Sequence, residues 1–119
     1  MVNVSTGIDL VPVARIAQYL ADGGDPAAIW APSELAECDG DIARLAGRWA
    51  AKEAVLKALR CGLATVVPTD VVVTGRDDGS PCVTLHGTAL LRARSLGLDT
   101  WAISITHDAG LAVATAVAA

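Results

Sequence analysis

The sequence predicts an α+β domain in which a mostly antiparallel sheet packs on one long helix. The chain has 119 residues, which is the size of a single domain with one core, so we expect residues 1–119 to form one unit. Its strand-like runs in the second half occur as pairs joined by short polar turns, as in antiparallel hairpins. Strong helix formers dominate a long stretch near the middle.

The N-terminal part predicts a strand followed by a short helix. Residues 2–11 are rich in β-branched side chains, so Asp9 would lie near the C-terminal end of the strand. Pro12 suits the first turn of a helix, and apolar residues then recur at helical spacing up to Leu20. The Asp-Gly-Gly-Asp-Pro segment at 22–26 ends this helix.

Two further helices are expected in the first half of the chain. Residues 32–37 predict a brief helix that is capped within 31–33. The next helix begins after Asp41, a good N-cap, and runs to about Leu59, with Gly62 as a natural stop. It is the longest predicted element, with apolar residues along most of its length.

The second half predicts two hairpins separated by a helix. The first hairpin joins residues 69–74 to 81–85 through a polar loop, and a helix follows over 88–95. The second hairpin joins two alternating runs at 101–106 and 111–117. The resulting order β-α-α-α-β-β-α-β-β is the basis of the α+β assignment.

Composition and charge exclude several classes of protein. Hydrophobic residues make up 53% of the chain and the mean hydropathy is +0.48, yet no apolar run approaches the roughly 20 residues of a membrane span. The N-terminus lacks the pattern of a secretory signal. The net charge of −4 provides no broad basic surface for nucleic acid. We expect a soluble, cytoplasmic protein that binds neither membranes nor nucleic acids.

The three cysteines give no sign of a metal or disulfide site. Cys38, Cys61 and Cys82 are an odd number, and no CxxC or Cys/His ligand spacing links them. Buried free thiols are the simplest interpretation.

The charged residues of the long helix form a pattern that stands out in this sequence. The chain has only two lysines, Lys52 and Lys57, and both flank Glu53. At 3.6 residues per turn, Trp49, Glu53 and Lys57 line up on one face, where a carboxylate and an ammonium can act on one ligand. In an arbitrary helix this would be an ordinary stabilising pair worth about 0.2–0.5 kcal/mol.

Residues 48–59 read RWAAKEAVLKAL and closely resemble the RFAAKEAxxKAL signature of holo-[acyl-carrier-protein] synthases, the small 4'-phosphopantetheinyl transferases. Other segments resemble elements of this family in the family's own order, over nearly the whole chain. They are GIDLV at 7–11 (its GxD strand), APSEL at 31–35 (its LTxxEL segment), DGSP at 78–81 (its xGKP turn) and ISITHD at 103–108 (its SxSHxxxxA element).

This resemblance implies an enzyme that transfers 4'-phosphopantetheine from coenzyme A to a serine of an apo acyl carrier protein and releases adenosine 3',5'-bisphosphate. It implies Mg²⁺ as cofactor, with Asp9 and Glu53 as metal ligands and with Glu53 and Lys57 as catalytic residues. It also implies that Arg48, Lys57 and His107 bind coenzyme A. A transfer at a diphosphate needs charge neutralisation more than covalent help, which suits this set of residues.

The residues taken alone leave alternatives open. Asp9 would suit a turn, His107 could close a hairpin, and Arg48 could be a solvated helix residue. Lys57, Glu53 and a metal-bound water remain alternatives for the base that takes the serine proton.

The resemblance further implies a homotrimer with its sites between subunits and an acidic carrier protein as partner. Arg15 matches a carrier-docking position, but Pro12 replaces the usual glutamate and the first helix has few basic residues. Arg60 and Cys61 replace the first two residues of the usual Gly-Thr-Gly, which removes freedom for a positive φ and places a long cation near the phosphate. A non-catalytic module that binds coenzyme A or a carrier protein, or a structural domain of a larger assembly, are the alternative interpretations.

Overall fold

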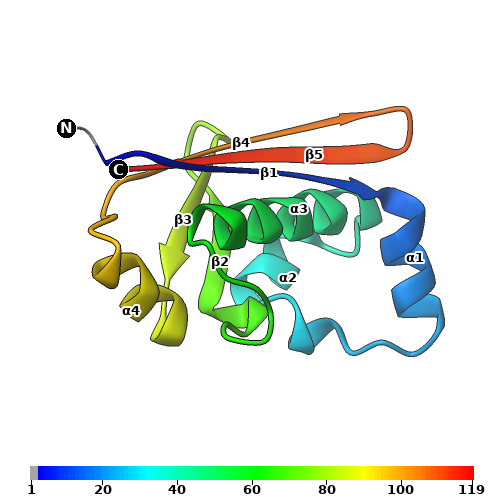
Figure 1. Ribbon diagram of the computed structural model, residues 1–119. Helices are drawn as coiled ribbons and strands as arrows, with labels where there is room; N and C mark the ends of the chain where they lie inside the picture. The colour runs from blue at the N-terminus through cyan, green and yellow to red at the C-terminus, as the bar shows by residue number, and fades with distance from the viewer. Residues whose placement is uncertain (1–2) are drawn as a thin grey trace.

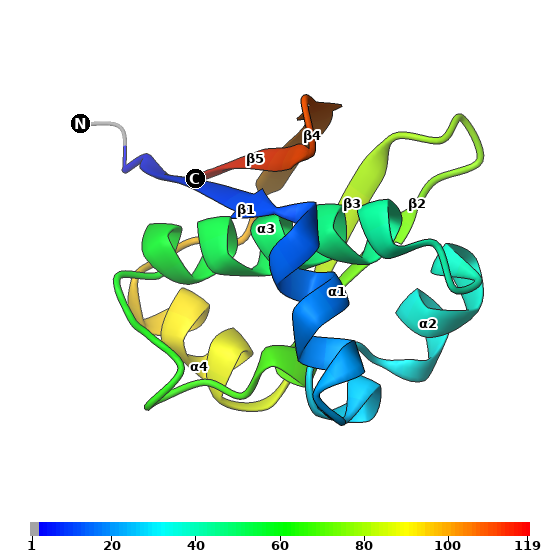
Figure 2. The ribbon, with the colours of Figure 1, turned by 90° about the vertical axis from the view of Figure 1, so that its right-hand side faces the viewer.

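The computed structural model describes residues 3–119, and in it a three-stranded sheet lies across one long helix (Figure 1). Strands β1 (Ser5–Pro12), β4 (Trp101–Asp108) and β5 (Leu111–Ala118) pair antiparallel in the order β1-β5-β4. The helix α3 (Ile42–Ala58) runs beneath this sheet in both ribbon views (Figure 2). The other elements are α1 (Val13–Ala21), η1 (Pro26–Ala28), α2 (Pro32–Cys38), η2 (Pro68–Asp70), β2 (Val71–Gly75), β3 (Pro81–Leu85) and α4 (Gly87–Ser95). The predicted α+β class is confirmed.

Small side chains allow the sheet to lie close on α3. Every second residue of β5 from Ala112 to Ala118 is a buried alanine, and α3 also buries alanines along its length. Strand β1 comes closest, because a Cβ added at Gly7 would lie 1.8 Å from the carbonyl oxygen of Ala54. Since side chains two apart in a strand share a face, this close approach also brings Asp9 against α3.

Strands β2 and β3 form a separate two-stranded sheet, whereas the sequence predicted one sheet. Their register runs from Val71 opposite Leu85 to Gly75 opposite Pro81. The other edge of β2 receives side chains of α2 and α3 in place of a neighbouring strand. These side chains close the edge of the hairpin that faces α2 and α3, whereas β3 is the strand of the hairpin that lies beside β4 of the larger sheet.

Two boundaries differ from the prediction in ways that affect candidate residues. Pro12 pairs with Leu111 at the end of β1 and precedes α1, so it ends a strand and does not start a helical turn. Its φ of −63° and ψ of 129° are ordinary for proline in extended backbone. Strand β4 extends to Asp108, which places His107 in a strand and leaves the turn at residues 109–110. The predicted strand start at residue 2 lies outside the described residues.

No helix within residues 3–119 is both long enough and apolar enough to cross a membrane. In the same part of the chain the three cysteines are free thiols, as their spacing predicted. Cys38 is buried, whereas Cys61 and Cys82 are only partly buried. Burial raises the pKa of the Cys38 thiol and that of Cys61.

Candidate active site

Asp9 and Lys57 meet where β1 crosses the C-terminal half of α3. The Lys57 ammonium donates to the carbonyl oxygen of Ile8 at 2.8 Å and to Oδ1 of Asp9 at 3.2 Å. Alternation along β1 turns Asp9 toward the helix, on the same side as buried Val11. The Lys57 side chain is 55% exposed and that of Asp9 18%, so the ammonium remains accessible to a ligand.

Glu53 lies one turn before Lys57 on α3 and adds a second carboxylate to this cluster. Partial burial raises the pKa of Glu53, the nearby charge of Asp9 raises it further, and Lys57 acts in the opposite direction. The influence of Asp9 on Glu53 shows that the two carboxylates share one electrostatic environment. The structure therefore brings together Asp9, Glu53 and Lys57, as the sequence predicted.

This cluster suits a hard divalent cation. Mg²⁺ prefers oxygen ligands and is commonly held by one or two carboxylates, with substrate phosphates and waters completing its shell. Within residues 3–119 no group of three or more His, Cys, Asp or Glu side chains could enclose a metal. Asp9 and Glu53 are two carboxylates, the number that Mg²⁺ commonly takes from a protein.

Arg48 and His107 lie together at a second place, near the N-terminal half of α3. Both line a cavity of about 180 Å³, and the full lining is Arg44, Gly47, Arg48, Gly75, Gly79, Pro81, Ile105 and His107. Nε2 of His107 lies 2.8 Å from the carbonyl oxygen of Ala43. A Cβ added at Gly47 would approach that nitrogen to 2.8 Å, so the glycine makes room for the imidazole. The lining residues Arg44 and Gly47 were not predicted as site residues.

Arg48 already has partners within the protein. Its guanidinium donates to the carbonyl oxygen of Val73 and lies 3.5 Å from the carboxylate of Glu37. The side chain is 16% exposed, which makes it less available than the neighbouring Arg44 at 63%. A phosphate in this cavity would meet Arg44 and His107 as well as Arg48.

The two predicted groups of site residues do not meet within one chain. Lys57 follows Arg48 by nine positions on α3, which corresponds to about 13 Å along the helix axis. Asp9, Glu53 and Lys57 lie toward the C-terminal end of α3, and the cavity with His107 lies toward its N-terminal end. A single chain therefore presents two separate groups of candidate site residues.

The sequence reasoning missed a buried ion pair beside these sites. Nζ of Lys52 donates to Oε1 of Glu34 at 2.7 Å, and both side chains are fully buried. Burial lowers the pKa of Lys52, and the Glu34 carboxylate partly offsets that effect. Lys52 also donates to backbone carbonyl oxygens, including Pro68 at 3.0 Å. The scarcity of lysine and glutamate in the chain was the only sequence signal for this pair.

Arg60 adopts the left-handed backbone that its family position calls for. Its φ is +55°, and it follows α3 as the C′ residue of a Schellman motif. The two defining bonds are present: Arg60 N–H donates to Lys57 O at 3.0 Å, and Cys61 N–H donates to Leu56 O at 3.1 Å. The turn therefore keeps its shape without glycine, which weakens the reason for expecting a non-catalytic protein.

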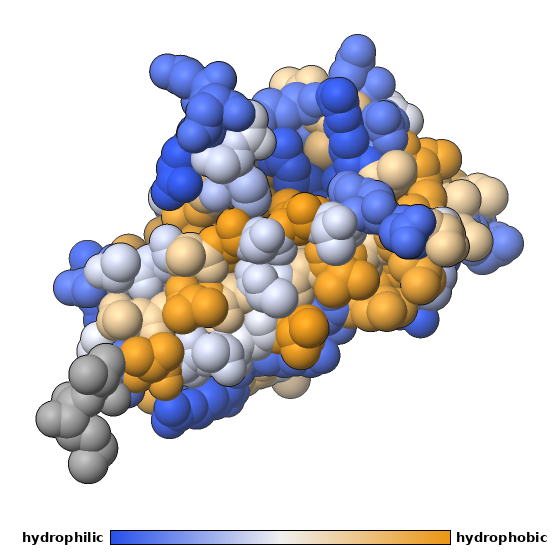
Figure 3. All heavy atoms as spheres, turned by 90° about the horizontal axis from the view of Figure 1, so that it is seen from above, coloured by the Kyte–Doolittle hydropathy of each residue, from blue (hydrophilic) through white to orange (hydrophobic). Residues whose placement is uncertain are grey.

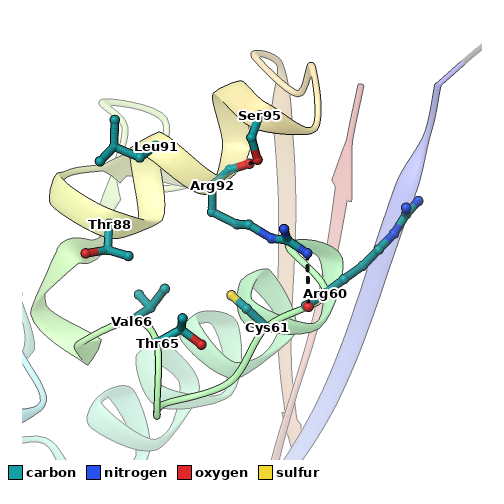
Figure 4. Close-up of a pocket in the computed structure, with 8 residues that line it drawn as sticks. All are labelled: Arg60, Cys61, Thr65, Val66, Thr88, Leu91, Arg92 and Ser95. Atoms are coloured by element: carbon teal, nitrogen blue, oxygen red, sulfur yellow. Dashed lines mark hydrogen bonds between the residues drawn. The ribbon is translucent and has the colours of Figure 1, made fainter.

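A larger cavity of about 500 Å³ lies between α4 and the segment after α3 (Figure 4). Arg92 holds its edge by donating to the carbonyl oxygens of Leu59 at 2.9 Å and Arg60 at 3.4 Å. The Arg60 side chain points away from the cavity, and neither carboxylate of the charged cluster lines it. This cavity is therefore separate from the cluster of Asp9, Glu53 and Lys57.

An apolar groove lies beside Arg15, the predicted docking residue. Arg15 is exposed on α1, and the groove is lined by Arg15, Ile16, Tyr19, Ile29, Trp49, Leu63 and Pro68. Trp49 is on the same face of α3 as Glu53 and Lys57. One helix face therefore leads from the groove to the charged cluster.

Comparison with known proteins identifies the family of this chain. The model of the 4'-phosphopantetheinyl transferase superfamily matches residues 5–115. The holo-[acyl-carrier-protein] synthase of Herpetosiphon aurantiacus is 36% identical, with 94% of this chain and 95% of that protein covered. The protein of the same name from Anaeromyxobacter sp. strain K is 42% identical, with 93% and 91% covered.

Solved structures give the same family. The Helicobacter pylori holo-[acyl-carrier-protein] synthase in complex with coenzyme A has a TM-score of 0.86 at 29% identity, covering 96% of this chain and 99% of that one. The Chronobacterium ammoniagenes complex with coenzyme A also has a TM-score of 0.86, at 26% identity, covering 97% and 96%. The chain belongs to the 4'-phosphopantetheinyl transferase superfamily and, within it, to the holo-[acyl-carrier-protein] synthase enzymes.

Proposed function

We propose that this protein transfers 4'-phosphopantetheine from coenzyme A to a serine of an apo acyl carrier protein and releases adenosine 3',5'-bisphosphate. The observation that carries the proposal is the cluster of Asp9, Glu53 and Lys57 at the crossing of β1 and α3. Relatives named holo-[acyl-carrier-protein] synthase, and similar structures solved with coenzyme A, support this substrate pair.

Asp9 and Glu53 would hold Mg²⁺ against the diphosphate of coenzyme A. When bound, the cation neutralises negative charge on the phosphate oxygens. Asp9 is already fixed by Lys57 and by its place in β1, so its position needs little reorganisation. The raised pKa of Glu53 reflects two nearby carboxylates in a partly buried place, an arrangement that a cation relieves.

Lys57 would stabilise the leaving bisphosphate. Its ammonium is half-exposed and carries two bonds to β1, which leaves one of its three N–H donors for a phosphate oxygen. Glu53 can accept the serine proton directly, because a carboxylate carries free lone pairs. Lys57 could accept it only after losing a proton of its own, since its ammonium has no lone pair.

The nucleotide end of coenzyme A would occupy the cavity of Arg48 and His107, which offers cationic and hydrogen-bonding groups to phosphate. Nine positions along α3 also turn the helix by about two and a half turns, so Arg48 and Lys57 project from opposite sides of it. We therefore infer that one subunit supplies the nucleotide half of each site and a neighbour supplies the metal half, as in the homotrimer that the family resemblance implies.

The outer face of the three-stranded sheet provides a surface for such an assembly. Apart from Asp108 at the end of β4, its exposed positions carry uncharged side chains, in a mixed apolar and weakly polar face with charged residues at the rim (Figure 3). They are Thr6, Ile8, Leu10, Ala102, Ser104, Thr106, Thr115 and Val117. Charge-poor patches that include exposed apolar residues are typical of protein interfaces.

The carrier protein would dock beside the groove of Arg15. Arg15 supplies a positive charge for an acidic partner, and the groove supplies apolar surface next to the helix face that leads to Glu53. Few basic neighbours support Arg15 on α1, where it is the one arginine or lysine of the helix.

Intact-mass measurement tests the proposed reaction. The protein is incubated with coenzyme A, Mg²⁺ and several apo carrier proteins. The proposal predicts that at least one carrier gains the mass of a single phosphopantetheinyl group and that EDTA prevents the gain. Binding of coenzyme A with no modified carrier in any of these reactions would instead support the non-catalytic module.

A further inference from the structure

The free edge of β2 is closed by charged side chains and not by a strand. Residues 71, 73 and 75 turn their backbone groups away from β3, toward α2 and α3. Two glutamates of α2 and two cations of α3 alternate along this edge. In order, Lys52 donates to Val71 O, Glu34 accepts from Val73 N–H at 2.9 Å, Arg48 donates to Val73 O, and Glu37 accepts from Gly75 N–H at 3.0 and 3.1 Å.

The two halves of this edge differ in environment. The inner pair, Glu34 and Lys52, is fully buried and belongs to the core. The outer pair, Glu37 and Arg48, is 34% and 16% exposed and lies at the cavity of His107. Arg48 and Gly75 both line that cavity, whereas Glu37 contacts both of them from outside the lining.

We infer that Glu37 is a positioning residue for the nucleotide end of coenzyme A, an inference that rests on the proposed function. Its carboxylate sets the direction of the Arg48 guanidinium and fixes Gly75, where the cavity wall formed by Gly79 and Pro81 begins. The hairpin has no strand pairing with the larger sheet, so hydrogen bonds along the β2 edge, together with packing of β3 beside β4, hold this wall in place.

The direction in which coenzyme A binding changes distinguishes a positioning role of Glu37 from an effect of its negative charge. Glu37 carries a negative charge close to a cavity that would hold phosphate, so its charge alone opposes binding of the anion. Removing the carboxylate should therefore improve coenzyme A binding if charge dominates. It should weaken binding if the carboxylate acts by holding Arg48 and Gly75.

The test compares Glu37→Ala, Glu37→Gln and the matched control Asp77→Ala. Asp77 is exposed in the loop between β2 and β3, so its removal changes the same charge without touching the β2 edge. The probes are coenzyme A and free adenosine 3',5'-bisphosphate, measured by calorimetry and by steady-state kinetics. Amide exchange at Gly75, in the wild type and in each variant, reports whether its N–H is held.

Positioning predicts that Glu37→Ala weakens binding of both probes and raises the KM for coenzyme A by about fivefold, the scale of one lost hydrogen bond, with kcat unchanged. Glu37→Gln has an amide oxygen that can accept from Gly75. Its KM and its affinity for both probes should therefore stay within about twofold of the wild-type values, on the scale of an exposed ion pair. Gly75 exchange should be fast only in Glu37→Ala, and Asp77→Ala should bind at least as tightly as wild type.

Unchanged or tighter binding by Glu37→Ala would overturn the inference, as would fast exchange at Gly75 in the wild type. Arg48→Ala and His107→Ala show which idea has failed. If they weaken binding and Glu37→Ala does not, the nucleotide site stands and only the role of Glu37 is wrong. If neither changes the affinity for adenosine 3',5'-bisphosphate, the proposed nucleotide site itself is wrong.

Discussion

At the scale of single residues, the charged cluster at the crossing of β1 and α3 places function in conflict with stability. Asp9 and Glu53 are held near one another, and burial adds to their repulsion in raising the pKa of Glu53. Without a cation, the folded state must carry this strain at neutral pH. Lys57 relieves part of it through its bond to Asp9.

We expect Glu53→Gln to stabilise the metal-free protein while abolishing most transfer. Because the pKa of Glu53 is raised in the folded state, that state binds the proton more tightly than the unfolded chain does. The free energy of unfolding should therefore fall as pH rises from the ordinary range of glutamate through the raised value. Urea titrations in EDTA across this pH range should show this fall in the free energy of unfolding in the wild type and not in Glu53→Gln. Equal pH dependence in both proteins would contradict this account.

Lys57→Ala should lower kcat by about ten- to a hundredfold while changing the KM for coenzyme A much less. Its charge matters most when negative charge develops on the leaving bisphosphate, as is general for electrostatic stabilisation of transition states. Steady-state kinetics with a carrier protein measures both constants. A change in KM alone would make Lys57 a binding residue.

At the scale of elements, the helix α3 was predicted almost residue for residue, because capping by Asp41 and strong helix formers act locally. Both hairpins were predicted because β-rich runs and the short polar turns between them are also local sequence signals. The side-chain closure of the β2 edge was not, since Glu34, Glu37 and Lys52 meet only after α2, α3 and β2 have packed. Burial of an ion pair leaves no local pattern in a sequence.

The end of α3 offers a stability test. Arg60→Gly should raise the free energy of unfolding by about 0.5–1 kcal/mol, because the left-handed penalty of about 1–2 kcal/mol outweighs the extra entropy of about 0.5–1 kcal/mol that glycine loses on folding. Urea denaturation with an unchanged slope would measure this gain. Arg60→Ala keeps the strained φ and serves as the control, for which no gain is expected. A destabilised Arg60→Gly would mean that the arginine side chain contributes more than its backbone costs.

At the scale of the whole molecule, one chain carries two separate groups of candidate site residues and a sheet face that is poor in charge. By resemblance, the sequence assigned five residues to one functional site: Asp9, Glu53, Lys57, Arg48 and His107. It could not show that Arg48 and His107 lie apart from the other three along α3. That separation follows from helix geometry, since nine residues of α3 span about 13 Å.

Subunit mixing tests whether sites form between copies. Lys57→Ala and Arg48→Ala each damage a different half-site, so assemblies that contain both variants would pair an intact metal half with an intact nucleotide half. Co-expressed variants should therefore regain part of the wild-type activity, while each variant alone remains weak. Size-exclusion chromatography with light scattering gives the number of subunits. No regain in verified mixed assemblies would place each complete site within one chain.

The central claim is that Asp9 and Glu53 form the Mg²⁺-dependent centre of transfer. Single-turnover transfer from coenzyme A to an apo carrier protein, followed by intact mass over a Mg²⁺ titration, tests it most directly, with Asp77→Ala, an exposed carboxylate in the loop between β2 and β3, as the control. Asp9→Ala and Glu53→Ala should fold normally, lose about a hundredfold or more in rate at ordinary Mg²⁺, and need far more Mg²⁺ for half-maximal rate, whereas the control behaves as wild type. Wild-type rates and an unchanged Mg²⁺ dependence in either variant would contradict the claim.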